Sequence, residues 1–352
     1  FKQKTAYEIP KRDWSSDVCS SDLKPVVAVI YTHSHVDHYA GVRGVIDEAD
    51  VKAGKVKVIA PDGFMEAVSG ENVLAGLAMA RRAQFQFGTM LPRGPRGQVD
   101  SGLGKAITRG TPGLIEPTML IVKPIEEHTI DGVRIVFQLA PETEAPAEMH
   151  MFYPGLGVLN MAENACPLLH NFIPLRGAVA RDPSVWSKYL AEALKLYAPE
   201  ADVLIGQHHW PIWGKEAIAD HLEAQRDLYK HIHDQTLRYI AKGWRPAEIA
   251  EAIDLPPGLD RRWNVRGYYG SVNHNVKAVY QRYLSWYDAN PANLHPLPPA
   301  PAFGAVSQAL RSATTAIMPR ILERILISPI SGVFHLSAAH DMRPANVTHN
   351  PR

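Results

Sequence analysis

The sequence predicts an α/β domain followed by an all-α segment. Up to about residue 215, short β-branched and apolar runs such as VVAVIY (26–31) alternate with helical patterns. From about residue 216 the strand-like runs stop, and amphipathic patterns with helical spacing replace them. A change from alternating strands and helices to helices alone is typical of an α/β fold joined to a separate helical part.

In the α/β part, each expected strand is an apolar run that ends in a turn signal, and each expected helix has apolar residues at a period near 3.6. The two runs on either side of Pro154-Gly155 are expected to form a hairpin. The many Gly and Pro residues of 92–118 predict a long loop. Strands are predicted at 26–31, 56–60, 133–139, 149–153, 158–161 and 203–206, and helices at 41–50, 72–87 and 186–197.

The all-α part holds three predicted helices, at 215–242, 246–253 and 272–286. Asn290-Pro291 and the Pro-rich stretch 296–302 are typical of a linker. We expect four regions: a segment 1–23 outside the fold, an α/β domain at 24–215, a helical domain at 216–295, and a linker and unassigned tail at 296–352.

The first 23 residues differ in character from the rest of the chain. Residues 11–23 (KRDWSSDVCSSDL) are rich in Ser and Asp and keep no period of 2 or 3.6. We interpret 1–23 as a translated linker or assembly scar, with an ordinary polar loop as the alternative.

Composition narrows the class of protein. The formal charge is +1, with 37 Lys+Arg against 36 Asp+Glu, so no global field favours nucleic acid or a membrane surface. The apolar runs are too short or interrupted to span a bilayer. Two distant cysteines cannot form a disulfide framework. No secretory signal pattern opens the chain, which begins with Phe1, and the compartment stays open.

A metal-binding pattern follows the first predicted strand, in Thr32-His33-Ser34-His35-Val36-Asp37-His38. Zinc binds imidazole nitrogen and carboxylate oxygen at about 2 Å. His33 and His35 are two positions apart at a strand end and so point the same way. Asp37 and His38 follow in the next turn. Four ligand-type side chains in six positions predict a centre that serves two metals about 3.5–4 Å apart.

Further candidate ligands follow other predicted strands. Strand-end loops meet at one edge of a sheet, so these residues can join the same site. By position alone, any of them could also be an ordinary exposed side chain. The candidates are Glu142, Glu144, Glu148, Glu163, His208 and His209.

The motif THSHVDH resembles the metallo-β-lactamase superfamily, and several neighbouring stretches resemble the linear alkyl sulfatases, the dodecyl-sulfate hydrolases. These stretches are ENVLAGLAMARRAQFQFG (71–88), TEAPAEM (143–149), MAENACPLLHNFIPLRGAVARD (161–182) and GQHHWPIWG (206–214). The resemblance runs from Lys24 to Pro299, about three-quarters of the chain. It implies an αββα sandwich, N-terminally incomplete here, followed by an α-helical dimerisation domain.

The resemblance also assigns the metal ligands. His33, His35 and Glu144 would bind one zinc, and Asp37, His38 and His208 the other. Glu163 and a water would bridge the two ions. Water held between two cations loses its proton near neutral pH, which gives a hydroxide nucleophile. The implied reaction is hydrolysis of an alkyl sulfate ester, such as dodecyl sulfate, to alcohol and sulfate, in a homodimer that needs two Zn²⁺ per chain.

Sulfate recognition is expected after Glu163. The resemblance assigns it to Asn171, Arg176 and Arg181, and a guanidinium suits a tetrahedral oxyanion. His170 is the candidate general acid. The sequence departs from the family pattern at Ile173 and Pro174, where a tyrosine and a threonine are expected.

Apolar substrate contacts are less specific. Met79, Phe85, Phe87 and Met90 are candidates for an alkyl-chain groove, although such a stripe at helical spacing is more often core.

Three other interpretations stay open. KGWRPAEIAEAIDLPP (242–257) has the pattern of the first helix of a DNA-binding helix-turn-helix, but Pro256-Pro257 breaks the position of a recognition helix. Another hydrolase of this fold, acting on phosphate esters, lactones or thioesters, is the second. The third is an inactive zinc-binding fragment: few residues precede Lys24 to supply the first strands of the sandwich, which predicts unpaired edges, aggregation and weak activity.

Overall fold

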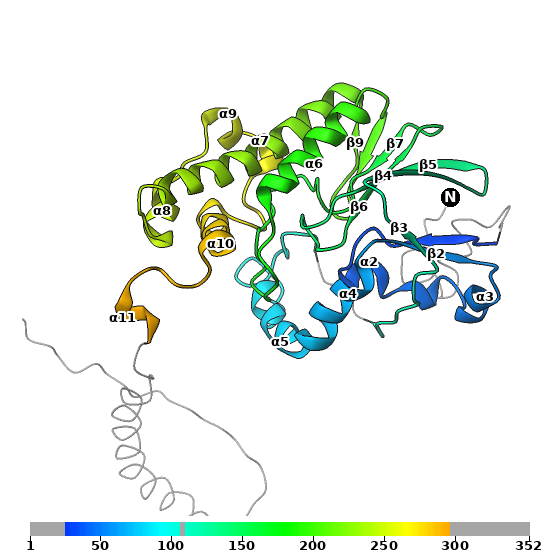
Figure 1. Ribbon diagram of the computed structural model, residues 1–352, viewed down its shortest axis with the longest axis horizontal. Coiled ribbons are helices and arrows are strands. Elements are labelled where there is room, and N and C mark those ends of the chain that lie inside the picture. The colour runs from blue at the N-terminus through cyan, green and yellow to red at the C-terminus, as the bar shows by residue number, and fades with distance from the viewer. Residues whose placement is uncertain (1–24, 106–109, 296–352) are drawn as a thin grey trace, which may run out of the picture. The chain divides into compact units, whose positions relative to one another are not determined.

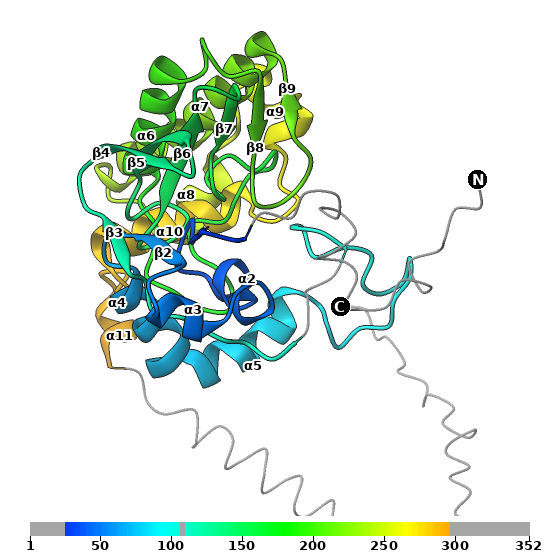
Figure 2. The same cartoon turned by 90° about the vertical axis from the view of Figure 1, so that its right-hand side faces the viewer.

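The computed structural model describes residues 25–105 and 110–295. The interpretation of residues 1–23 and the prediction for 296–352 therefore lie outside the described residues. The arrangement of the described chain is shown in Figures 1 and 2.

The first sheet has three parallel strands in the order β1-β2-β3. These are β1 (Ala28–Ile30), β2 (Lys57–Pro61) and β3 (Met119–Ile121). Within the described range, β1 pairs with β2 and with no other strand, and Val26 and Val27 just before it are 44% and 38% exposed. Short helical elements connect these strands: α2 (Val36–Tyr39), a 3₁₀ turn (Val42–Gly44), α3 (Glu48–Lys52), α4 (Phe64–Val68), the π-helical turn η2 (Ser69–Leu74) and α5 (Gly76–Gln86).

Two predicted helices differ from the observed ones. The helix expected over 41–50 is wrong, because a 3₁₀ turn ends at Gly44 and α3 begins only at Glu48, after Asp47 in extended conformation. The helix expected over 72–87 is divided into η2 and α5, and its first turn has the wider π geometry. The 92–118 loop holds no helix or named strand in its described residues.

The second sheet has six strands in sequence order, all antiparallel neighbours except the parallel pair β7-β8. The predicted hairpin at 149–161 is confirmed. Strand β4 was missed because its sequence IEEHTI has three charged or titratable residues and shows only half-burial on one face. The six strands are β4 (Ile125–Ile130), β5 (Val133–Leu139), β6 (Met149–Tyr153), β7 (Val158–Asn160), β8 (Val203–Ile205) and β9 (Ile212–Trp213).

Three apolar cores show the layering. One lies between the two sheets and joins Ile59 and Ile121 to Phe137 and Met149. A second lies between the three-stranded sheet and its helices, around Phe64. The third lies between the six-stranded sheet and its helices. The layers are therefore helix, sheet, sheet, helix, and the αββα prediction is confirmed; Figure 2 shows the strands between the two groups of helices.

Helices α6 (Pro183–Leu196) and α7 (Lys215–Ile240) cover the six-stranded sheet, as Figure 1 shows. Helix α6 starts three residues before the predicted 186, because Asp182 caps it by accepting from the backbone N–H of Ser184 and Val185, and Pro183 occupies the first turn. On α7, Ile218, Leu222 and Leu228 are buried in the same core as β7. The predicted division after residue 215 stays a prediction.

The chain after α7 is helical, as predicted. Helix α10 packs on α7 and α8, and α9 is only four residues long. The described residues after α8 therefore offer no recognition helix at the position that a helix-turn-helix requires. The elements are α8 (Pro246–Ala252), α9 (Pro257–Asp260), a 3₁₀ turn (Trp263–Val265), α10 (Val272–Leu284) and α11 (Pro291–Leu294).

Candidate metal centre

The histidine motif lies between the end of β1 and α2. His33 forms a β-bridge with Glu148, which ties the motif to the chain that enters β6. His33 is fully buried and His35 is 6% exposed. Helix α2 then presents Asp37 and His38, whose side chains are 48% and 7% exposed. The candidate ligands of this motif, which are close in sequence, therefore lie together at one edge of the sheet.

The remaining candidate ligands come from three strand ends. Glu144 lies in the turn between β5 and β6, Glu163 follows β7, and His208 follows β8. Because β7 and β8 are parallel neighbours, their carboxyl ends meet at one edge. Glu144 and Glu163 are almost completely buried, at 2% and 3% exposure.

These side chains form two groups, and the ligand atoms of each group lie within 4.8 Å of one another. In the first group, Glu144 Oε2 lies 2.8 Å from His35 Nδ1 and 3.6 Å from His33 Nε2. In the second group, Asp37 Oδ2 lies 3.4 Å from His38 Nε2 and 3.7 Å from His208 Nε2. The first group is His33, His35, Glu144 and Glu163, and the second is Asp37, His38 and His208.

Glu163 connects the two groups. Its Oε2 lies 3.3 Å from His33 Nε2 in the first group. The same oxygen lies 3.1 Å from His38 Nε2 and 3.4 Å from His208 Nε2 in the second. Glu163 therefore lies close enough to both groups to be a candidate ligand shared by two metal ions.

The polar atoms of the centre fit bound cations. In the described part of the chain, the Nε2 atoms of His33, His38 and His208 are buried without a hydrogen-bond partner. The second ring nitrogen is contacted for two of these histidines: His33 Nδ1 lies 3.0 Å from Thr32 Oγ1, and His208 Nδ1 lies 3.0 Å from the Leu103 carbonyl. Leaving such atoms unpaired in the interior is costly, and a metal ion would satisfy them.

The charges of the side chains in the centre also favour a bound cation. Burial lowers the pKa of His33 to about 4, so this ring is neutral at pH 7. Burial would raise the pKa of Glu163, but His208 and His170 hold it well below its usual value. Burial would lower the pKa of His38, yet Asp37 and Glu163 raise it to about 11. At pH 7 His38 is therefore protonated when no metal is bound, and it would release this proton on binding a metal, because metals bind neutral imidazole and ionised carboxylate. The ionised acids Asp37 and Glu163 attract positive charge to this position.

Two family descriptions match the chain. "Metallo-beta-lactamase superfamily" matches residues 20–208, and "Alkyl sulfatase dimerisation" matches residues 245–317. The chain belongs to the metallo-β-lactamase superfamily. The second match covers the helical end of the chain and is to a domain description of alkyl sulfatases.

The chain is also similar to proteins named as alkyl sulfatases. An alkyl/aryl-sulfatase of Saccharomyces cerevisiae, BDS1, is 56% identical over 276 residues, which cover 78% of this chain and 43% of the relative. A linear primary-alkylsulfatase of Pseudomonas sp. is 54% identical over 277 residues, 79% of this chain and 41% of that one. The crystal structure of the stereoselective inverting sec-alkylsulfatase Pisa1 from Pseudomonas sp. superimposes with a TM-score of 0.78 at 48% identity and covers 86% of this chain and 49% of that one. This chain therefore spans less than half the length of these relatives.

Of the three acidic residues in the 142–148 turn, Glu144 alone belongs to the metal-type groups. Glu142 is exposed and pairs with Arg282 at 2.9 Å. Glu148 accepts from Thr143 Oγ1 at 3.0 Å and from the backbone N–H of Ala145 and Glu163 at 3.0 and 3.1 Å. Burial raises the pKa of Glu148 well above its usual value. Glu148 thus holds the backbone on which two candidate ligands sit.

Three of the residues assigned to sulfate chemistry lie in a buried network beside Glu144 and Glu163. Arg181 donates to Asn171 Oδ1 at 2.8 Å and also contacts Glu144. His170 is 1% exposed, with Nε2 3.1 Å from Glu163 Oε1 and Nδ1 2.9 Å from Arg181 Nη1. These contacts fit positioning of the two carboxylates. His170 is not among the residues that line the cavity described below, and its role as general acid stays a prediction.

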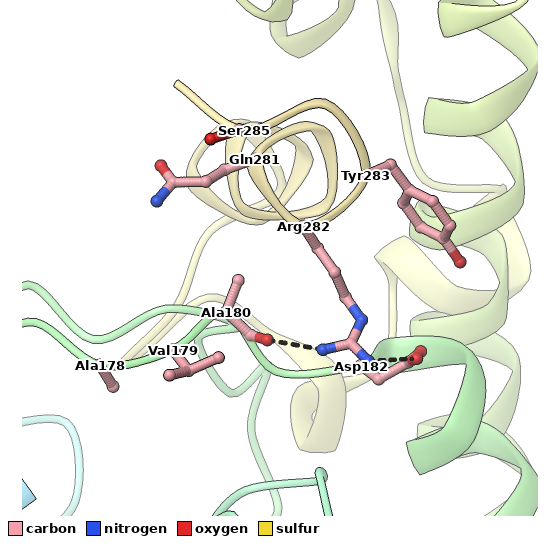
Figure 3. A pocket seen from close by; sticks show the side chains of 8 residues that line it. All are labelled: Ala178, Val179, Ala180, Asp182, Gln281, Arg282, Tyr283 and Ser285. Carbon is pink, nitrogen blue, oxygen red and sulfur yellow. Dashed lines mark hydrogen bonds and ion pairs between the residues drawn. The ribbon is translucent and has the colours of Figure 1, made fainter. Parts of the chain in front are cut away.

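Residues of the helical part contact the backbone of this network. Asn275 on α10 donates to the His170 carbonyl at 2.8 Å and accepts from the Phe172 N–H at 2.9 Å. A Cβ at Gly270 would lie 2.6 Å from the His170 carbonyl, so only glycine permits this approach. Figure 3 shows Arg282 of α10 reaching the Ala180 carbonyl and Asp182, the two neighbours of Arg181. Helix α10 thereby fixes both ends of the predicted sulfate segment.

A cavity of about 620 Å³ opens onto the metal-type residues. Its lining includes Arg176 and four of the candidate ligands, which are His35, Asp37, His38 and His208. Arg176 is thus the predicted sulfate residue that reaches open space beside the centre.

The four apolar candidates on α5 and in the turn after it divide into two sets. Met79 and Phe87 line the cavity. Phe85 and Met90 are 83% and 75% exposed and are not among the lining residues. None of the four side chains is buried, so the alternative that this stripe is plain core is wrong.

Residues that the motif analysis did not single out also line the cavity. They are Glu71 and Asn72 of η2, Gly76, Ala80 and Ala83 of α5, and Ser101, Leu103 and Gln207. The residues of η2 and α5 lie in the family-like stretch 71–88, and Gln207 lies in the family-like stretch 206–214. Ser101 and Leu103 lie in the predicted 92–118 loop and carried no such signal. Among the described residues, no helix has the length and apolar character needed to cross a membrane.

Proposed function

We propose that this chain carries the two-zinc site of an alkyl sulfatase, which hydrolyses alkyl sulfate esters such as dodecyl sulfate. The observation that supports this most is the pair of ligand groups joined by Glu163, because four of their residues line a cavity that Arg176 also lines; these four are His35, Asp37, His38 and His208. The sulfatase names of the relatives and the family-like segments favour a sulfate ester over the phosphate esters, lactones and thioesters that related folds hydrolyse.

The donor set suits zinc because it combines imidazole nitrogens with carboxylate oxygens. His33, His35 and Glu144 would hold one ion, Asp37, His38 and His208 the other, and Glu163 both. Two bound zinc ions would supply a Lewis-acid centre that activates water and draws the ester's sulfate oxygens.

The chain's own residues supply orientation. Arg176 can present its guanidinium to the sulfate group, since its planar donors match a tetrahedral oxyanion. Met79, Phe87 and Leu103 offer apolar surface in the same cavity to the alkyl chain. Arg181 and His170 hold Glu144 and Glu163 in place. The helical part would form the dimer that its family description names.

The direct test measures zinc content and sulfate release from dodecyl sulfate on the same purified sample. We expect two zinc ions per chain and sulfate release that a strong chelator abolishes and added zinc restores. Turnover of a phosphodiester, lactone or thioester without sulfate release would replace this function by another hydrolase activity. Folded protein that binds zinc and turns over none of these esters would show an inactive zinc-binding chain.

A further inference from the structure

Glu71 lies where the two halves of the proposed site meet. It occupies the π-helical turn η2, is 9% exposed and lines the cavity. Its Oε2 lies 3.5 Å from His35 Nε2 and accepts a hydrogen bond from Arg176 Nη1 at 3.3 Å. One carboxylate oxygen therefore faces both a candidate zinc ligand and the candidate sulfate arginine. Single π turns inside helices occur often at functional sites.

The His35 ring points into the centre with the nitrogen opposite to the one that His33 and His208 use. His35 Nδ1 lies 2.8 Å from Glu144 Oε2, on the metal side. Its Nε2 is buried without a hydrogen bond to any described residue, and it faces the Glu71 carboxylate. Metal-binding histidines almost always donate the second ring N–H to a carboxylate, a carbonyl or water.

The other histidines make this outer contact differently. His33 uses Thr32 Oγ1 and His208 uses the Leu103 carbonyl. Glu71 fills the corresponding place beside His35, and it is charged. A carboxylate at that place fixes the ring orientation and increases the basicity of the nitrogen that faces the metal.

Arg176 is anchored at one end by the same group. Its Nη1 contacts Glu71 Oε2, Met79 Sδ at 3.5 Å and the Gly177 carbonyl at 3.4 Å. Its backbone N–H donates to Gln86 at 2.7 Å. A guanidinium has five N–H donors, so fixing Nη1 leaves donors that can face a sulfate.

We propose that Glu71 is a positioning residue that couples the first zinc site to sulfate recognition. It orients His35 for the metal and aims Arg176 into the cavity. The sulfate half of this inference rests on the proposed function, whereas the zinc half depends only on the donor set.

The test compares Glu71→Ala and Glu71→Gln with Glu66→Gln, a matched control at an exposed glutamate of α4. Zinc affinity is measured by competition with a chelator, and kcat and KM are measured with dodecyl sulfate. Glu71→Ala removes the acceptor, so we expect zinc affinity to fall about 10- to 100-fold. Glu71→Gln keeps an acceptor oxygen and loses the charge, so its loss should be smaller. The control should match the unaltered chain in both measurements.

A double variant tests the link to Arg176. If Glu71 acts partly through Arg176, the loss in kcat/KM of Glu71→Gln with Arg176→Ala should fall short of the product of the single losses by about 3-fold or more. Thermal melting of each variant identifies any that has simply unfolded.

Each outcome is decisive. Zinc affinity of Glu71→Ala within about 2-fold of the unaltered chain overturns the zinc half, and strictly multiplicative losses overturn the coupling to Arg176. If the unaltered chain binds zinc but releases no sulfate, the proposed function fails, while the chelator competition still tests Glu71.

Discussion

The histidines of the metal centre and those of the apolar core have little exposure to solvent but differ in their hydrogen bonds. His221 on α7 has Nε2 2.8 Å from the Ala165 carbonyl and Nδ1 2.9 Å from Asn264 Nδ2. His150 on β6 likewise has contacts at both ring nitrogens, with Gln138 and Asn164. In the centre, His33 and His208 each keep one contacted nitrogen and one buried nitrogen that faces carboxylates without a hydrogen bond.

This difference separates a structural histidine from a candidate ligand. Burial alone does not, because His33, His150 and His221 are all at most 2% exposed. A core histidine satisfies its polar atoms within the protein, whereas a ligand leaves one nitrogen for the metal. Substitutions in the two regions should therefore differ in their effects on metal content, turnover and stability.

Removing the shared carboxylate should have the largest effect. In Glu163→Ala, both ligand groups lose their common oxygen, so zinc content should fall below two per chain. Dodecyl-sulfate turnover should drop on the order of 10³-fold or more, since a metal centre supplies several kcal/mol of stabilisation to the transition state. The exposed Glu200→Ala is the control. Full zinc content in Glu163→Ala would exclude a bridging role.

Arg176→Ala should impair catalysis while leaving the metal in place. We expect kcat/KM for dodecyl sulfate to fall by roughly 2–3 kcal/mol, the scale of losing a charge-assisted contact. Arg81→Ala, at an exposed arginine of α5, should change neither kinetics nor zinc content. Unchanged kinetics in Arg176→Ala would remove Arg176 from the site.

Substitution of the core histidine His221 should change the free energy of unfolding and leave the metal content unchanged. Burial lowers the pKa of His221 to about 4 from 6.5. The unfolded chain therefore takes up a proton at a higher pH than the folded chain, so the stabilisation is complete above about pH 6.5 and is lost as the pH falls toward 4. Between pH 7 and 5 this histidine should cost about 2 kcal/mol of unfolding free energy.

Denaturant melts of the unaltered chain and of His221→Gln at both pH values isolate this contribution. The variant's loss between pH 7 and 5 should be smaller by that amount. Equal losses in the two proteins would show that His221 does not stay neutral in the fold.

The smallest expected effect concerns two phenylalanines at the end of α5, Phe85 in its last turn and Phe87 directly after it. Phe87→Ala removes apolar surface from the cavity, so the apparent binding of dodecyl sulfate, measured as KM, should weaken by about 1 kcal/mol. Phe85→Ala alters a side chain that is 83% exposed, and should stay within about 0.5 kcal/mol in both KM and stability. A larger effect of Phe85→Ala than of Phe87→Ala on KM would indicate that the alkyl chain binds outside the cavity.

Local sequence was sufficient to predict part of the fold and of the site. The motif at 32–38 could be interpreted because its ligands lie on one strand end and the following turn, and β5 and the 149–161 hairpin followed from alternation and a Pro-Gly turn. Family resemblance, rather than spacing, singled out Glu144 among three carboxylates in one turn.

What the sequence could not show depends on tertiary contacts. Glu71 and Arg176 are 105 positions apart, and only the fold brings them together. The burial of Arg181 and His170 depends on α10, which Arg282 and Asn275 attach to their segment. The strand β9 has two residues, too few for a periodic pattern.

The most direct test of the central claim is a zinc count on folded protein, made on the unaltered chain, His208→Ala and His221→Gln. We predict two zinc ions in the unaltered chain, two in His221→Gln and fewer in His208→Ala. One equivalent or none in well-folded unaltered chain, or equal loss in both variants, would contradict the assignment of the two ligand groups.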